Sequence, residues 1–241
     1  MSAPLLKLEG VHTHIGVYHI LHGVDLVVPR GQLTMLLGRN GVGKTTTLRT
    51  IMGLWAASQG RITFAGDNIT SLNTPSIAQK SIAYVPENMG IFADLTVKEN
   101  MVLAARHARN QSQMDEQRLE WIFELFPAIQ KFWNHSAGKL SGGQKQMLAM
   151  SRAMVEPRDL LIVDEPSKGL APAMVDNMID AFKRLKDSGV TILLVEQNLH
   201  FAQQLGDTVA VMDDGRVVYA GSMQSLTDDE KLQHSLLGLA L

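Results

Sequence analysis

Cysteine is absent from the 241-residue sequence, so disulfide bonds and thiolate chemistry are excluded. No wholly apolar run comes near the roughly 20 residues that a membrane-spanning helix needs. The start of the chain also lacks a basic stretch followed by an apolar core, so we expect no secretory signal peptide. Together these absences lead us to expect a cytoplasmic protein that does not cross a membrane by itself.

A strong charge of either sign is also missing. The 22 Lys and Arg residues nearly balance the 24 Asp and Glu residues, which gives a formal net charge of −2. Proteins that bind nucleic acid usually carry a basic surface, so we expect no nucleic-acid partner. Hydrophobic residues make up 45 % of the chain and charged residues 19 %, a balance typical of a globular protein with a substantial core.

The pattern of apolar residues changes twice along the chain. Residues 5–75 are mostly strand-like and rich in turns, whereas residues 93–138 show helical spacing with few turn signals. After residue 155, short apolar runs alternate with helical segments, as in "DLLIVDEP" followed by "AMVDNMIDAFKRLKDSG". Such alternation is typical of a parallel sheet buried on both faces, so we predict an α/β fold.

A glycine-rich loop follows the apolar run "LTMLL". The segment "GRNGVGKTT" fits the pattern G-x-x-x-x-G-K-[ST] and opens a helical segment, which is the context that a phosphate-binding P-loop requires. Its backbone N–H groups would face a phosphate, Lys44 would reach the β- and γ-phosphates, and the Thr45 hydroxyl would ligate Mg²⁺. The nucleotide-binding residues predicted here are Gly38, Arg39, Asn40, Gly41, Val42, Gly43, Lys44, Thr45 and Thr46.

Two acids end the apolar strand "LLIVDEP". A buried strand can deliver Asp164 beside the P-loop, where a carboxylate can hold Mg²⁺ directly or through water. Glu165, the next residue, could act as the general base that orients or deprotonates an attacking water. The P-loop and this strand together predict a nucleotide hydrolase or kinase.

A Ser and two glycines open a further helical segment in "KLSGGQKQM". Unpaired N–H groups at a helix start attract anions. The text "LSGGQ" closely resembles the signature of the ABC ATPases, the ATP-binding subunits of membrane transporters. In that family the signature lies too far from its own P-loop to reach its own ATP, so the resemblance implies binding to the γ-phosphate held by a second subunit. The residues assigned to this role are Ser141, Gly142, Gly143 and Gln144.

The resemblance covers essentially the whole chain, with all the family's motifs in order. It implies a P-loop NTPase core of the RecA type with a mostly parallel sheet, an N-terminal antiparallel β subdomain and an inserted helical subdomain. We predict one domain over residues 1–241, with the core and β subdomain in 5–92 and 155–241. Residues 93–154, approximately, would form the helical subdomain that carries the signature. The implied cofactors are ATP and Mg²⁺.

Three positions depart from the family's commonest pattern. Glu87 in "YVPENMGIF" takes the Q-loop position where most members have Gln, and a carboxylate there could ligate Mg²⁺ strongly. "SKGLAP" at 167–172 replaces the commoner D-loop text. Gln197 stands where most members have the switch histidine; it can hydrogen-bond the γ-phosphate or the water but cannot carry a proton. Glu165 would then act alone as the base, with His200 as an alternative proton carrier.

Two features near the N-terminus leave alternatives open. By the family's spacing, the residue that stacks on adenine falls at Ile15, with Tyr18 close behind; we expect Tyr18, because an aromatic face stacks better. His12 and His14 share one face if the segment is a strand, which suits either a metal site or a polar strand face. No further ligand is obviously placed to complete a metal shell, so we expect the polar face.

The departures, with "LLGL" near the C-terminal end, look like the ATP-binding subunits of branched-chain amino acid importers, and like the shorter of the two ATPase subunits that such systems pair. ATP hydrolysis would then drive uptake of branched-chain amino acids or a related small amino acid or amide. The implied partners are a second ABC ATPase subunit, transmembrane permease subunits and, indirectly, an extracytoplasmic substrate-binding protein. The implied location is peripheral, at the cytoplasmic face of the inner or plasma membrane. We expect the apolar segment "SLLGLAL" to dock as a helix end.

Two other classes of ATPase or P-loop protein fit the sequence less well. ABC ATPases that act on nucleic acid or ribosomes usually insert long coiled coils or carry two cassettes, whereas this chain shows one cassette and no sustained heptads. A P-loop kinase or GTPase would give no reason for "LSGGQ", and the guanine-reading text Asn-Lys-x-Asp is absent.

Overall fold

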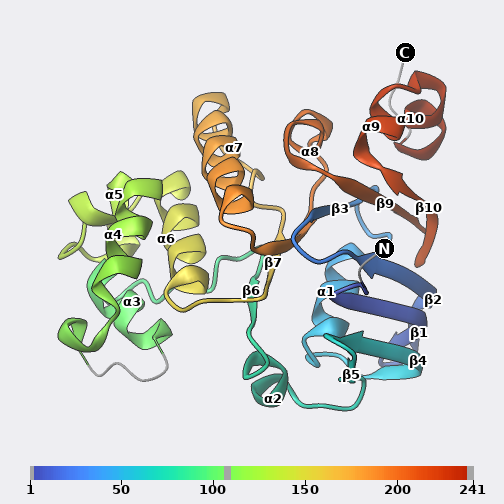
Figure 1. Ribbon diagram of the computed structural model, residues 1–241, viewed down its shortest axis with the longest axis horizontal. Coiled ribbons are helices and arrows are strands. Elements are labelled where there is room, and N and C mark those ends of the chain that lie inside the picture. The colour runs from blue at the N-terminus through green and yellow to red at the C-terminus, as the bar shows by residue number, and fades with distance from the viewer. Residues whose placement is uncertain (1–2, 106–109, 238–241) are drawn as a thin grey trace.

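The structure is a computed structural model that describes residues 3–105 and 110–237 (Figure 1). Of these residues, six strands form the central sheet, in the spatial order β10 (Arg216–Ser222), β9 (Thr208–Asp213), β3 (Leu33–Leu37), β8 (Thr191–Val195), β7 (Leu160–Asp164) and β6 (Ile82–Val85). Neighbouring strands are parallel except β10, which pairs antiparallel with β9 at one edge. The α/β fold with a mostly parallel sheet is therefore confirmed.

The second sheet is antiparallel and comes from the N-terminal part of the chain. Its strands, in spatial order, are β2 (Tyr18–Val28), β1 (Leu6–Ile15), β4 (Ala57–Phe64) and β5 (Asp67–Asn68). Helix α1 (Lys44–Ile51) packs its buried Leu48 and Ile51 into the same apolar cluster as residues of this sheet. A buried hydrogen bond of 3.0 Å between the hydroxyls of Thr13 and Thr50 joins β1 to α1. The expected antiparallel sheet is present.

The strands of the central sheet are buried on both faces. In β3, Met35 belongs to the apolar cluster formed with the helices, whereas its neighbour Leu36 belongs to the cluster formed with α1 and the antiparallel sheet. The same alternation puts Val163 of β7 into the first cluster and Ile162 into the second. Continuous apolar strands are thus explained by two cores on opposite faces.

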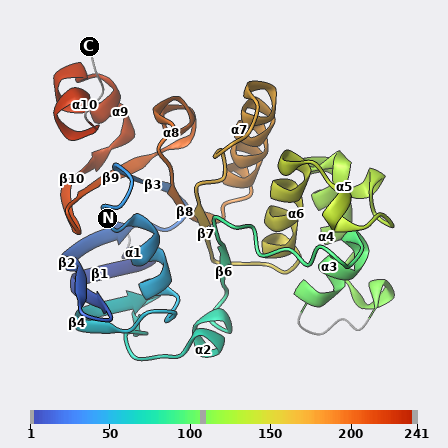
Figure 2. The same ribbon diagram turned by 180° about the vertical axis from the view of Figure 1, so that it is seen from behind.

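Helices form the opposite end of the molecule from the antiparallel sheet, as Figures 1 and 2 show. They are α3 (Val97–Ala104), α4 (Glu116–Leu125), α5 (Pro127–Lys131) and α6 (Gly142–Met154), with short 3₁₀ turns at Gln111–Gln113 and Ala137–Lys139. Helix α3 begins with a capping box, in which the Thr96 hydroxyl accepts the N–H of Glu99 at 3.1 Å and the Glu99 carboxylate accepts the N–H of Thr96 at 2.7 Å. Along α6, Met147, Met150 and Met154 are buried, as core packing requires.

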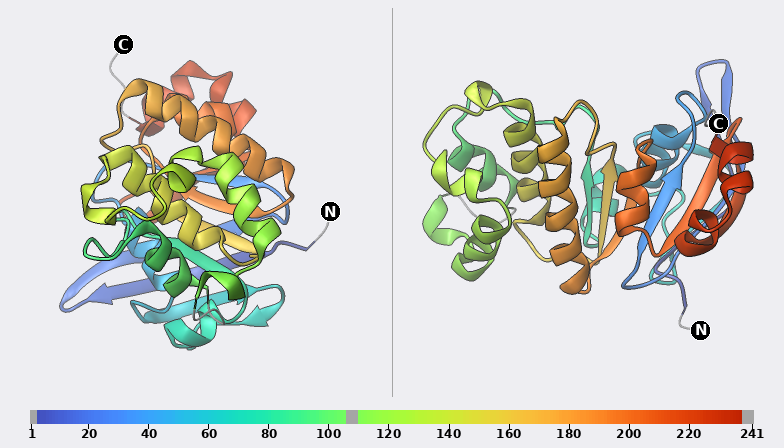
Figure 3. Two further views of the ribbon diagram at one scale, coloured as in Figure 1. Left: turned by 90° about the vertical axis from the view of Figure 1, so that its left-hand side faces the viewer. Right: turned by 90° about the horizontal axis from the view of Figure 1, so that it is seen from above.

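The remaining helices are α2 (Thr74–Ala78), α7 (Pro172–Asp187), α8 (Leu199–Leu205), α9 (Met223–Thr227) and α10 (Glu230–Leu237). Seen from above in Figure 3, α7 lies between the α3–α6 group and α8. Leu236 and Leu237 of α10 pack against the core, whereas residues 238–241 of "SLLGLAL" lie outside the described residues. Among the residues that the structure describes, no helix combines the length and apolar character needed to span a membrane.

Candidate nucleotide site

The glycine-rich loop joins β3 to α1 in a backbone shape that side chains would disturb. Gly38 and Gly43 have φ angles of 146° and 103°, in the region that favours glycine. A Cβ atom on Gly38 would lie 2.4 Å from the carbonyl oxygen of Met212. Gly43 is the N-cap of α1 and contributes no side-chain cap, so the first N–H groups of the helix stay available to an anion.

Lys44 is held inside this loop. Its Nζ donates to the carbonyl oxygens of Gly38 at 2.8 Å and Arg39 at 2.9 Å, and it lies 3.8 Å from Oε1 of Glu165. Burial lowers the pKa of Lys44, while the carboxylates of Glu165 and Asp164 act in the opposite direction. The loop therefore holds a buried ammonium group, of the kind that contacts phosphate oxygens in a P-loop. Gly41, Val42 and Thr46 complete the loop and the first turn of α1.

Asp164 lies at the end of β7, fully buried beside the P-loop. The Thr45 hydroxyl donates to its Oδ1 at 3.1 Å, and the Tyr84 hydroxyl donates to its Oδ2 at 3.5 Å. Burial raises the pKa of Asp164 to about 6; the bond from Thr45 opposes this change, and the nearby carboxylates of Glu165 and Glu87 add to it. Burial, followed by the charge of Asp164, raises the pKa of Tyr84 to about 12.

These donors fit a magnesium ion. Mg²⁺ prefers hard oxygen ligands and usually binds one or two carboxylates together with substrate phosphates. Thr45 and Asp164 are joined directly, and Glu87 lies close enough for its charge to act on Asp164. In the described part of the chain, no group of three or more His, Cys, Asp or Glu side chains is arranged to hold a metal ion. Nucleotide oxygens would therefore have to complete the ligand shell.

Glu165 has both carboxylate oxygens engaged. Its Oε1 accepts from Nε2 of Gln197 at 2.5 Å, and its Oε2 lies 3.2 Å from Nζ of Lys168. The same amide nitrogen of Gln197 donates to Oδ1 of Asn40 at 2.6 Å. The φ angle of Glu165 is +49°, an uncommon value for a residue with a side chain, and such local strain is often found at functional sites. The structure thus brings Glu165, Gln197 and the P-loop together, while His200 is exposed on the first turn of α8.

Two further charged residues belong to this site and were missed in the sequence. Lys168 forms an ion pair of 2.5 Å with Glu87 as well as its contact to Glu165. Glu196 is 2 % exposed, and its carboxylate accepts the N–H groups of Ser167 at 2.8 Å and Gln197 at 3.1 Å. Burial raises the pKa of Glu196. The one available signal was their position, since Lys168 follows Glu165 by three residues and Glu196 directly precedes Gln197.

The signature residues form the start of α6, away from the P-loop. Ser141 is the N-cap, and its N–H donates to the side-chain oxygen of Gln144 at 2.9 Å, so Gln144 stabilises the helix start. A Cβ atom on Gly142 would meet no heavy atom within 4 Å, whereas one on Gly143 would lie 2.5 Å from Cε of Met174 in α7. Figure 1 shows α6 and α1 on opposite sides of β7.

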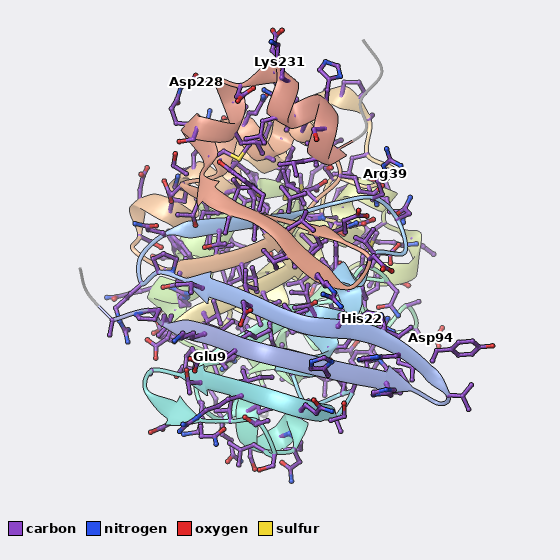
Figure 4. All side chains as sticks on the ribbon, turned by 90° about the vertical axis from the view of Figure 1, so that its right-hand side faces the viewer. Glu9, His22, Arg39, Asp94, Asp228 and Lys231 are labelled. Atoms are coloured by element: carbon purple, nitrogen blue, oxygen red, sulfur yellow. The ribbon has the colours of Figure 1, made fainter. Side chains whose placement is uncertain are left out.

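The two adenine candidates lie together, and the histidines form a cluster. Ile15 pairs directly with Tyr18 across the β1–β2 hairpin, and Tyr18 is 71 % exposed. On the same two strands, the ring of His19 stacks on that of His14 with centroids 4.1 Å apart, and it lies 4.2 Å from that of His22. Figure 4 labels His22 and, on the loop after β3, Arg39; the N–H of His22 donates to the carbonyl of Gly215 at 2.8 Å, which ties β2 to the β9–β10 turn.

Residues 21–168 match the family model described as "ABC transporter". The chain belongs to the ABC transporter family. It therefore has the ATP-binding domain of an ATPase family.

Individual ABC proteins match over almost the whole chain. The chain is 37 % identical to the high-affinity branched-chain amino acid transport ATP-binding protein BraG of Pseudomonas aeruginosa, over 97 % of this chain and 100 % of that one. It is 28 % identical to BraF of the same organism, over 100 % of both. A crystal structure of an ATP-binding cassette of an ABC transporter in its ADP conformation superposes with a TM-score of 0.79, at 25 % identity, over 96 % of this chain and 97 % of that one.

Proposed function

We propose that this protein is the ATPase subunit of an importer for branched-chain amino acids or similarly small amino acids or amides. The observation that carries this proposal is the match to BraG over the full length of that protein. Identity to BraG exceeds identity to BraF, 37 % against 28 %, which favours the first of these two ATP-binding proteins as the counterpart. A second, different ATPase subunit is then the expected partner.

The site supports a defined hydrolysis step. Lys44 and the N–H groups at the start of α1 would hold the phosphates, and Thr45, Asp164 and Glu87 would hold Mg²⁺, which supplies charge stabilisation when bound. Glu165 would take a proton from the attacking water. The water oxygen forms a bond to the γ-phosphorus, the bond from that phosphorus to the bridging oxygen breaks, and ADP leaves with the electron pair. Gln197 would orient Glu165, because it already donates to that carboxylate.

The ATP site is incomplete in one subunit under this proposal. Ser141, Gly142 and Gly143 open a helix away from the P-loop, and a Cβ atom on Gly142 would meet no heavy atom within 4 Å. An exposed helix start of this kind can bind the terminal phosphate of a nucleotide held by a partner. Two such subunits would enclose two nucleotides between them.

A groove offers a place for the transmembrane subunits. It measures about 770 Å³ and lies between the central sheet and the α3–α6 group, next to the loop that carries Glu87. Its wall includes Trp55, half-exposed Leu54 and Arg152. Apolar and aromatic walls with a few charges suit a short amphipathic helix of a partner. The subunit would thereby act at the cytoplasmic face of the membrane, as a peripheral protein.

The test uses cells of a strain that normally takes up leucine through a binding-protein-dependent route. The gene for this chain is deleted from these cells, and each variant is then supplied separately. Radiolabelled leucine uptake should return with the wild-type chain and stay absent with Glu165→Gln, because loss of a general base costs roughly hundredfold or more in rate. Glu120→Gln, which removes an exposed carboxylate of α4, is the matched control and should restore uptake. Unchanged leucine uptake in cells without the chain would contradict the proposed cargo.

ATP-driven pairing is tested separately by light scattering on purified Glu165→Gln. Blocked hydrolysis should trap the closed pair, so the mass should double with ATP and Mg²⁺ if two copies pair. A protein that binds ATP and stays monomeric would indicate that a different ATPase subunit is the natural partner.

A further inference from the structure

Lys168 occupies a position between two functional carboxylates. Its Nζ lies 2.5 Å from Oε1 of Glu87 and 3.2 Å from Oε2 of Glu165. The two acids come from different parts of the chain: Glu87 lies in the loop after β6, and Glu165 directly follows β7. The side chain of Lys168 is 55 % exposed, so it can leave this position without unfolding its surroundings.

The charges of the site need a cation at this point. The carboxylates of Glu165 and Glu87 both lie near enough to act on that of Asp164. Lys44 approaches the other oxygen of Glu165 at 3.8 Å and is held by loop carbonyls, so it cannot also neutralise Glu87. Like charges in a partly buried site repel one another, and an opposite charge placed between them offsets this repulsion. Lys168 supplies that charge within residues 3–105 and 110–237.

We propose that Lys168 is a positioning residue that acts as a tethered counter-ion. It holds Glu87 and Glu165 together in the nucleotide-free subunit and gives up Glu87 to the magnesium ion that arrives with ATP. The inference rests on the proposed magnesium site of Thr45, Asp164 and Glu87. Its consequence is a competition, because an ammonium group held against the Glu87 carboxylate repels a metal ion that approaches the same carboxylate.

The size of the effect follows from the exposure of the pair. An exposed ion pair lowers the affinity of a competing ligand by roughly two- to fivefold at most, since water screens the charges of the pair. Removing the ammonium group should therefore tighten metal binding by about this factor. The loss of a nearby positive charge acts in the same direction, so the two contributions do not cancel.

The experiment measures metal affinity directly. Mn²⁺ replaces Mg²⁺ as the probe, and its free concentration is read from its paramagnetic resonance signal. The non-hydrolysable ATP analogue AMP-PNP is kept below the protein concentration so that nearly all of it is protein-bound, and AMP-PNP without protein gives the baseline. Lys168→Met should lower the dissociation constant of Mn²⁺ by roughly two- to fivefold. Lys168→Arg, which keeps the charge, should stay close to wild type. Lys80→Met, which breaks a comparable exposed ion pair with Asp67 (2.7 Å), is the control and should change nothing.

A second set of variants, made in the Glu87→Gln protein, tests whether the effect of Lys168→Met comes from the shared carboxylate or from a general loss of structure. In Glu87→Gln protein, Lys168→Met should lose most of its effect on Mn²⁺ affinity, because the shared carboxylate is gone. Equal Mn²⁺ affinity of wild type and Lys168→Met would overturn the inference while leaving the magnesium site intact. Failure of wild-type protein with AMP-PNP to bind Mn²⁺ would overturn the magnesium site, and the inference with it. Thermal unfolding of each variant should differ little from wild type, since an exposed ion pair adds little stability.

Discussion

Asp164→Asn should make the nucleotide-free protein more stable near neutral pH. Burial raises the pKa of Asp164 from its ordinary value of 3.8 to about 6, so the folded chain binds this proton more tightly than the unfolded chain. The free energy of unfolding therefore falls as the pH rises from about 4 to about 6. Above about pH 6 the carboxylate is ionised in both states, so its destabilising contribution no longer changes with pH. About two pKa units correspond to about 3 kcal/mol, which the neutral amide avoids.

The assay is urea unfolding of wild type and Asp164→Asn without metal or nucleotide, at several pH values. The stability difference should be about 3 kcal/mol at about pH 7.5, about half of that at about pH 5, and small at about pH 4. The amide oxygen can still accept from Thr45, so the bond of 3.1 Å need not be lost. Asp67→Asn is the control; Lys80 lowers the pKa of Asp67, so this variant should gain nothing. A stability difference that does not change with pH, or a wild type that is more stable than Asp164→Asn at neutral pH, would refute the reasoning.

Two further substitutions test local stability, one in the glycine-rich loop and one in α3. Gly38→Ala should lose about 2 kcal/mol or more of stability in thermal unfolding, because its Cβ would collide with the carbonyl of Met212 at 2.4 Å; Gly142→Ala, at an open position, should not, and equal melting of both variants would contradict this. Asn100→Ala should cost about 1–3 kcal/mol in urea unfolding, because the buried Asn100 amide accepts the N–H of Phe92 and donates to its carbonyl, both at 2.9 Å. An unchanged urea midpoint would show that water replaces these bonds.

The parts of the site that the sequence predicts are formed by residues that lie close together in the sequence. A loop of fixed spacing after a strand must place Lys44 and Thr45 at one helix start, because a few consecutive dihedral angles decide the shape. The order of strands and helices likewise predicts the parallel sheet. The resulting α/β fold and family membership are both confirmed, whereas the individual roles of Glu165, Gln197 and Tyr18 stay predictions.

The parts that were missed depend on contacts between distant segments. Lys168 reaches Glu87 across 81 positions of the chain, and nothing in either local pattern encodes that distance. The carboxylate of Glu196 accepts the N–H of Ser167 across 29 positions. Both contacts arise because parallel strands bring their carboxyl ends to one edge of a sheet, where the loops that follow them meet. A single sequence shows which loops meet there, but not which side chains pair.

The close approach of Gly143 to Met174 has a mechanical consequence. The methionine methyl group fills the space where a side chain on Gly143 would stand, so the start of α6 and the first turn of α7 are in direct contact. That turn continues directly from the segment that carries Lys168. Under the proposed pairing, the start of α6 that would meet a partner's nucleotide and the lysine beside Glu165 thus lie at the two ends of one continuous segment. Met174 is the residue through which a change at one end would reach the other.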